Sequence, residues 1–275
     1  MSVADLKRTR SMEVEKERVF MYIFQCEDSL DGIFTAIYDA WDSGYGLMNV
    51  RIEVLNGRDD CYNMELFSEY ITVEPDEEKA EKVARSIRSK ISEEAYEMVG
   101  YAAVSDSPWK ADRILRFLML GFRVGASVVN RLGDDAVRDL FELRRYVGNE
   151  LHLYTGFLRF SELDNGVMFA KFEPKSDLTA LIMPHFANRF PDENMVIYDV
   201  ARKKAAVCRK GSKWFMTEVS DEIAECVMNA TDAEADYQKL WKSYFAHMAI
   251  EERINPKLQR NMLRLRFRTH MTEFL

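Results

Sequence analysis

The sequence predicts an α+β protein in which an antiparallel sheet, built from a hairpin and a meander, packs with a helical layer. Three observations support this class. Apolar residues recur at helical spacing through much of residues 75–150. The pair Asn165 and Gly166 then separates two strand-like runs, which is the strongest short signal for a hairpin. Further short strand-like runs follow, and hairpins joined to flanking helices are typical of α+β proteins.

The length and composition indicate a globular chain. With 275 residues, the chain can bury about three quarters of its unfolded surface. A content of 47% apolar and 31% charged residues excludes a disordered chain. We expect a single family-wide unit over residues 1–275, with a helical subregion at 75–150 and a sheet-plus-tail subregion at 151–275.

The sequence predicts a cytoplasmic protein with no membrane contact. Residues 1–18 carry charges of both signs and no apolar stretch, unlike a secretory signal. The most apolar run, 114–132, contains three arginines, which are costly in lipid, so we expect a buried helix there. The four cysteines form no CxxC pair, which is typical of reduced thiols in a cytosolic protein.

The chain is predicted to open with a strand that leads into an amphipathic helix. Residues 19–24 form the strand, and Ser29 is placed to cap the helix. Pro75 begins a second helix at a favoured first position. The buried stripes are Leu30, Ile33, Phe34, Ile37 and Trp41 in the first helix and Ala80, Val83, Ala84, Ile87 and Ile91 in the second.

Two further helices complete the predicted helical layer. One begins at residues 107–108 and ends at Gly133. Its Gly121 and Gly125 would let a neighbouring helix approach closely. The next helix begins near Asp134, and its inner face consists of Val137, Leu140, Phe141 and Val147.

The predicted sheet follows these helices. Between its hairpin and its meander, residues 176–190 are predicted to form a helix that is broken or restarted at Pro184. The predicted strands are Phe157–Leu163, Val167–Phe172, Met195–Val200, Ala205–Arg209 and Trp214–Met216.

Charge is unevenly distributed toward the carboxyl end, although the net charge is −8. Residues 218–236 contain seven acids and no base, whereas residues 253–270 contain six bases and no acid. The net negative charge therefore does not exclude a nucleic-acid partner. Between the two runs, one helical stripe is predicted to pack in the core, namely Tyr237, Leu240, Trp241, Tyr244 and Met248.

Several stretches together carry a family resemblance. Residues 31–36 fit the family's opening helix, and the more specific stretches are Val147–His152 with Gly156–Phe160, Pro184–Phe190 with Ile197–Asp199, and Asn255–Arg260. In their joint order and spacing they resemble a bacterial family of unknown biochemical function labelled as DNA metabolism proteins. Residues 263–267 depart from that pattern, because a proline and an aromatic pair are expected there.

The resemblance implies partners rather than an activity. Members are encoded beside a radical S-adenosylmethionine protein with a role in DNA repair or modification, and some are fused to domains similar to uracil-DNA glycosylases. No catalytic residue carries over from the family. A radical-type iron–sulfur cluster needs three close thiolates and an iron–sulfur glycosylase needs four, so we expect no metal or cofactor in this chain.

Three residues are candidates for acid and base catalysis. Glu150 and His152 can pair only if the helix has ended by Gly148, because residues two apart on a helix diverge by roughly 200°. The alternative is that Glu150 accepts a hydrogen bond from a nearby arginine and His152 packs at the helix–sheet junction. His185 is the third candidate.

A second group of polar residues surrounds His185. His185 and Arg189 share a helical face and can grip a phosphate. Asp199 and Arg202, near a strand end, can complete a polar pocket. The alternative is an ion pair between Arg189 and Asp199 that steadies the sheet.

The basic tail is the most direct functional signal. Lysine and arginine neutralise phosphates, and the interleaved Phe267 and His270 can stack on bases. The tail can instead bind the acidic residues 218–236 or a protein partner, or remain solvated. The nucleic-acid-binding candidates are Arg159, Arg189, Lys257, Arg260, Arg264, Arg266 and Arg268.

The leading hypothesis is a nucleic-acid-associated accessory protein in DNA metabolism or repair. It would position DNA or RNA for a radical S-adenosylmethionine or glycosylase-type partner. One alternative is a hydrolytic enzyme on nucleic acid or a nucleotide, which requires Glu150, His152 and His185 to converge. The other is a module that only holds the partner protein. The sequence does not decide whether the chain is an enzyme.

Overall fold

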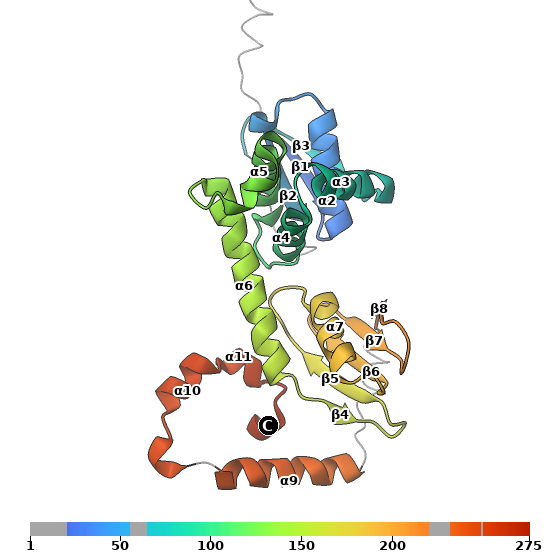
Figure 1. The fold of residues 1–275 in the computed structure, drawn as a ribbon, viewed down its shortest axis with the longest axis vertical. Helices are drawn as coiled ribbons and strands as arrows, with labels where there is room; N and C mark the ends of the chain where they lie inside the picture. The colour runs from blue at the N-terminus through green and yellow to red at the C-terminus, as the bar shows by residue number, and fades with distance from the viewer. Residues whose placement is uncertain (1–20, 56–64, 220–231, 249) are drawn as a thin grey trace, which may run out of the picture. The chain divides into compact units, whose positions relative to one another are not determined.

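The structure is a computed structural model that describes residues 21–55, 65–219, 232–248 and 250–275. The chain divides into two compact units, Met1–Tyr146 and Val147–Leu275. The division falls inside one helix, α6 (Asp135–Phe157). Each unit has a sheet of its own (Figure 1), so the described residues form two sheets where the sequence predicts one.

All three strands of the first sheet run parallel, in the order β2-β1-β3. The predicted antiparallel sheet is therefore wrong for this unit. Helix α2 (Leu30–Asp42) joins β1 to β2, and a helical crossover places two strands parallel. Ser29 caps α2 as predicted, because its Oγ accepts the Gly32 N–H at 3.0 Å. The strands are β1 (Met21–Glu27), β2 (Val50–Leu55) and β3 (Ser68–Val73).

Three more helices belong to this unit. Helix α3 packs on α2, α4 packs between α3 and α5, and α5 packs on β2. Asp76 and Ser92 cap α3 and α4 with their side chains. Among the described residues, no helix is both long and apolar enough to cross a membrane. These helices are α3 (Glu77–Lys90), α4 (Glu93–Ala103) and α5 (Lys110–Val124).

The predicted close approach of a neighbouring helix to α5 is confirmed at Gly121, which lies against the end of α3. A Cβ on Gly121 would lie 2.7 Å from Ile91 Cδ1, at the end of α3. Gly125 has another role, because its φ of +69° ends α5 and the chain continues as the 3-10 helix η3 (Gly125–Asn130). The predicted single helix reaching Gly133 is therefore divided in two.

The second sheet is mixed, in the order β4-β5-β6-β7-β8. Strands β4 and β5 are antiparallel, and so are the pairs β6–β7 and β7–β8. Strands β5 and β6 are parallel, because α7 (Thr179–Arg189) crosses between them. The predicted antiparallel sheet is wrong at this junction. The strands are β4 (Ser161–Glu162), β5 (Met168–Phe172), β6 (Met195–Asp199), β7 (Lys204–Cys208) and β8 (Phe215–Glu218).

The predicted hairpin is present, but its first strand is shorter than expected. Asn165 Oδ1 accepts the Val167 N–H at 3.1 Å, and Gly166 has a φ of +74°. Because α6 continues to Phe157, only Ser161–Glu162 pairs with β5. Helix α7 also differs from expectation, since it runs unbroken through Pro184.

A chain of short helices ends the second unit (Figure 1). Asn255 caps one of them, since its Oδ1 accepts the Leu258 N–H at 3.0 Å. The predicted core face of α9 is wrong, because its large apolar side chains are exposed. We call residues 232–275 the C-terminal segment. Its elements are α9 (Asp232–Met248), η4 (Glu251–Arg253), α10 (Pro256–Met262), α11 (Leu265–Arg268) and η5 (Thr272–Phe274).

Candidate functional site

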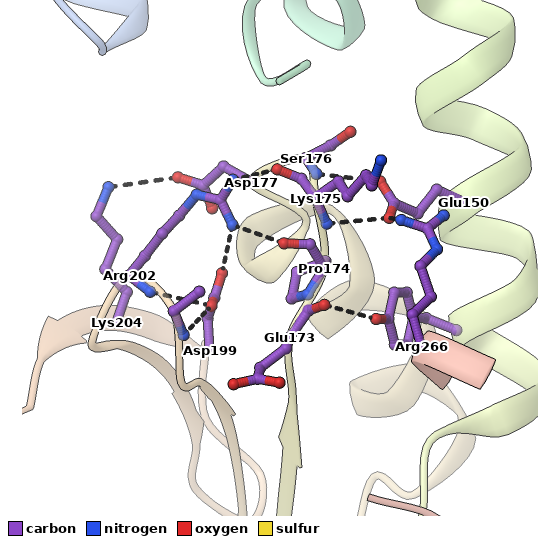
Figure 2. A network of polar contacts seen from close by, with 12 residues as sticks. Glu150, Glu173, Pro174, Lys175, Ser176, Asp177, Asp199, Arg202, Lys204 and Arg266 are labelled. Atoms are coloured by element: carbon purple, nitrogen blue, oxygen red, sulfur yellow. Dashed lines mark hydrogen bonds and ion pairs between the residues drawn. The ribbon is translucent and has the colours of Figure 1, made fainter. Parts of the chain in front are cut away.

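Glu150 is a buried anchor at the carboxyl end of α6. Its side chain is almost fully buried, and its two oxygens accept the Lys175 and Ser176 N–H groups at 3.0 Å each. Arg266 Nη1 lies 2.8 Å from Glu150 Oε1, in ion-pair contact without hydrogen-bond alignment. Figure 2 shows the carboxylate between the arginine and the loop after β5. Glu150 therefore joins three separate parts of the second unit.

Asp199 holds the other side of the same loop. It is fully buried at the end of β6, and burial raises its pKa while Arg202 opposes the rise. Arg202 Nη1 donates to Asp199 Oδ2 at 3.0 Å and to the Pro174 carbonyl at 3.1 Å. Arg202 also donates to the Lys175 carbonyl (Figure 2). Arg202, and not Arg189, is the partner of Asp199, so the predicted Arg189–Asp199 pair is wrong.

The three candidate catalytic residues do not converge. Helix α6 is continuous through Phe157, so Glu150 and His152 lie on different faces. Glu150 is buried and engaged, whereas His152 is exposed and does not pack at the helix–sheet junction. His185 and Arg189 are exposed on α7, and the Arg189 guanidinium lies 5.6 Å from the centre of the Phe190 ring. The structure therefore supplies no acid–base pair from Glu150, His152 and His185.

Three of the predicted nucleic-acid-binding arginines have intramolecular partners. Arg159 donates to both Glu273 oxygens, at 3.3 and 2.7 Å. Arg266 faces Glu150, and Arg268 donates to the Leu263 carbonyl at 3.1 and 3.3 Å. Arg159 and Arg266 join the C-terminal segment to the rest of the second unit, whereas the Arg268 contact lies within the segment.

Glu273 is the buried partner of Arg159. Burial acts to raise its pKa, but the hydrogen bond from Arg159 and other donors outweigh it, so the pKa is lowered. Trp241 Nε1 also donates to Glu273, at 3.3 Å. One carboxylate thus joins α9, η5 and the chain after α6.

The two predicted base-stacking residues of the tail are enclosed. Phe267 is only 4% exposed, and its ring centre lies 4.8 Å from that of Tyr154. His270 is mostly buried near Glu173, and burial lowers its pKa. The prediction that Phe267 and His270 stack on bases is therefore wrong.

Four exposed cations of the C-terminal segment have no polar partner among the described residues. They have no ion pair, and their side chains make no hydrogen bond, within the part of the chain that the structure describes. The predicted alternative partner, the acidic residues 218–236, lies largely outside the described residues. The four cations are Arg253, Lys257, Arg260 and Arg264.

A family comparison covers this whole arrangement. A family model described as a domain of unknown function, DUF4130, matches residues 108–273, which is more than half of the chain. The chain belongs to the DUF4130 family. Glu150, Asp199, Glu273 and the four exposed cations all lie inside the DUF4130 match. The family description names no activity, so function rests on the site itself.

Other comparisons add little to the DUF4130 assignment. No curated protein matches the sequence. A solved DHH domain, described as belonging to a member of a family of ribosomal proteins, is similar with a TM-score of 0.31 and 11% identity. The match covers 78% of this chain and 80% of that chain. At that TM-score the likeness does not establish a shared fold.

Sequence reasoning missed a groove in the DUF4130 region. It has a volume of about 850 Å³, and it lies between α9 and the chain around Phe160. Tyrosine and tryptophan, rather than leucine and isoleucine, predominate on the α9 face that was assigned to the core. Their polar tips suit a half-exposed surface, and this was the available signal. The lining residues include Arg159, Phe160, Tyr237, Trp241, Tyr244 and Thr272.

The described cysteines are buried and do not line this groove. Burial raises the pKa of the Cys26 thiol to about 12, so it stays protonated at neutral pH. Cys208 is also buried, whereas Cys61 and Cys226 lie outside the described residues. No group of three or more His, Cys, Asp or Glu side chains in the described ranges is arranged to hold a metal ion.

Proposed function

We propose that this protein binds nucleic acid through its C-terminal segment and acts as an accessory protein in DNA metabolism or repair. The observation that carries the proposal is the set of exposed cations at Arg253, Lys257, Arg260 and Arg264, which no described carboxylate neutralises. The family resemblance adds the expected setting, beside a radical S-adenosylmethionine or glycosylase-type partner. That partner supplies the chemistry, and this chain positions the DNA or RNA.

The binding mechanism is neutralisation of phosphates. Each lysine or arginine that meets a phosphate releases condensed counterions, which favours binding at low salt. Four contacts predict a slope of log affinity against log salt of about −3 for a single strand and about −4 for a duplex. The fixed arginines Arg159, Arg266 and Arg268 already have intramolecular partners and are not counted as phosphate ligands.

The test removes the exposed charges without touching the fixed ones. A variant with Lys257→Gln, Arg260→Gln and Arg264→Gln should bind a single strand at least about tenfold more weakly at low salt. Its salt slope should fall by about 2. Both quantities are measured by fluorescence anisotropy at several salt concentrations.

A matched control carries the same loss of charge in the first unit. Arg85→Gln, Arg123→Gln and Arg145→Gln change three exposed arginines, and this variant should bind like the wild type. Equal weakening of both triple variants would attribute the effect to net charge alone. Wild-type binding that is indifferent to salt would reject the proposal.

A second candidate is a protein-interaction module. It is favoured by the many large apolar side chains that the C-terminal segment exposes, because exposed apolar surface marks protein–protein contact sites. Copurification with the partner enzyme, together with no measurable binding to DNA or RNA, would select this function. The exposed apolar residues include Leu240, Met248, Ile254, Leu258, Met262 and Leu265.

A further inference from the structure

The groove beside α9 is walled by aromatic rings that are open to solvent. Tyr237 is 69% exposed, Tyr244 is 54% exposed and Trp241 is 40% exposed. Phe160 faces them from the chain after α6. The Trp241 and Tyr244 ring centres are 5.8 Å apart, with 30° between the ring planes. Helix α9 therefore presents aromatic rings that remain partly open to solvent.

Trp241 is held in place before any ligand binds. Trp241 Nε1 is bonded to Glu273, which Arg159 also holds. One turn earlier, Gln238 Nε2 donates to Ser161 Oγ at 3.3 Å. Because both walls of the groove are tied together, little conformational entropy remains to be lost on binding.

A nucleic-acid strand carries phosphates as well as bases, and the unpaired cations of the C-terminal segment are available to the phosphates. The exposed cations Arg260 and Arg264 belong to the same C-terminal segment, which packs back on α9 through η5. Glu234 also lines the groove, but its carboxylate accepts the Glu162 N–H and the Gln238 amide. The C-terminal segment therefore carries both the exposed rings of α9 and the unpaired cations that follow α9 in the sequence.

We propose that this groove binds the unpaired bases of a single-stranded nucleic acid. Each base has a π-face that stacks on tryptophan or tyrosine, while the strand's phosphates meet the exposed cations. Bases inside a duplex are already stacked and paired, so they cannot enter. The inference rests on the proposed function and specifies its substrate as single-stranded.

The test separates bases from phosphates with two probes of equal charge. One is a twelve-residue oligothymidylate, and the other is an abasic deoxyribose phosphate chain of the same length. Each stacked base contributes a factor of roughly 5 to 150 in affinity. The wild type should therefore bind the oligothymidylate at least about tenfold more tightly than the abasic chain.

Variants of Trp241 and Tyr244 test whether the contribution of the bases to affinity arises in the groove. Trp241→Ala with Tyr244→Ala should lower oligothymidylate affinity to about the abasic value and leave abasic binding unchanged. Trp241→Phe with Tyr244→Phe keeps the ring faces and should retain most of the affinity, even where the alanine variant folds poorly. Trp109→Ala removes another exposed tryptophan, 52% exposed in the first unit, and should have no effect.

Each other outcome overturns the inference in a distinguishable way. Equal, salt-dependent binding of both probes rejects base stacking and leaves the proposed function standing. Binding of neither probe rejects the proposed function as well. If the alanine variant instead converts an oligomer to a monomer in analytical ultracentrifugation, with oligothymidylate affinity unchanged, the face is a contact between copies of this chain.

Discussion

Two arginines of the C-terminal segment, only two positions apart, have opposite surroundings. Arg266 faces the buried carboxylate of Glu150 and stacks on Phe267 at 4.6 Å. Arg264 stands just before α11, exposed, with no ion pair among the described residues. The comparison teaches that an acid-free basic run does not have one role. Where a buried carboxylate lies opposite an arginine, as for Arg266, the arginine has a structural role. Where no described carboxylate lies opposite, as for Arg264, the charge remains available to a ligand.

The largest expected effect comes from removing the carboxylate that fixes Arg266. Glu150→Ala leaves two backbone N–H groups without their acceptor and a guanidinium without its ion-pair partner, so we expect a loss of about 3–5 kcal/mol in the free energy of unfolding of the second unit. Urea unfolding measures it. The exposed Glu193→Ala is the control, expected to stay within about 0.5 kcal/mol. Equal stability of the two variants would show that Glu150 is not an anchor.

The Arg159–Glu273 pair should come next. Arg159→Ala leaves the almost fully buried Glu273 carboxylate without its main donor. We expect a loss of about 2–3 kcal/mol, less than for Glu150, because Trp241 still donates to Glu273 and no backbone N–H loses its acceptor. Thermal or urea unfolding of the second unit gives the value. A loss as small as that of an ordinary surface arginine would contradict it.

The same pair predicts a dependence on pH. The pKa of Glu273 is lowered from an ordinary value of 4.5, so its contribution to stability is complete above that pH and is lost as the pH falls through the lowered value. Glu273→Gln should therefore be less stable than the wild type at neutral pH, and the difference should shrink in acid. Unfolding curves between pH 7 and about pH 3 test this. A constant difference would contradict the assignment.

The smallest expected effect on stability is that of changing Arg264. Comparing it with Arg266, two positions away, gives the sharpest contrast. Arg264→Gln should change the free energy of unfolding by less than about 0.5 kcal/mol. It should reduce the salt slope of single-strand binding by about 0.7. Arg266→Gln should do the reverse, lowering stability and leaving the slope unchanged. Identical behaviour of the two variants would remove the distinction between fixed and exposed cations.

Local signals predicted the elements better than their arrangement. The Ser29 cap and the hairpin at Asn165 and Gly166 were predicted because neighbouring residues make both contacts. Strand β2 (Val50–Leu55) was missed, although its buried and half-buried residues alternate. Strand direction was wrong where α2 and α7 intervene, because direction depends on the connection between strands.

The sequence predicted the residue types of the candidate site better than it predicted which residues contact one another. Glu150 was recognised as a partner for an arginine, but the arginine is Arg266, far along the chain. The α9 stripe was recognised as aromatic and helical, yet Trp241 and its neighbours face solvent. Periodicity identifies a face, whereas burial depends on which other elements reach that face.

By itself the sequence determined the helix caps, the hairpin turn and the separation of acidic from basic runs, because these depend on residues a few positions apart. Only the tertiary structure decided that Arg159 and Arg266 are neutralised while Arg260 and Arg264 are not. Each of those ion pairs joins residues more than a hundred positions apart. Such pairs exist only once the chain has folded and water has been excluded around the carboxylate.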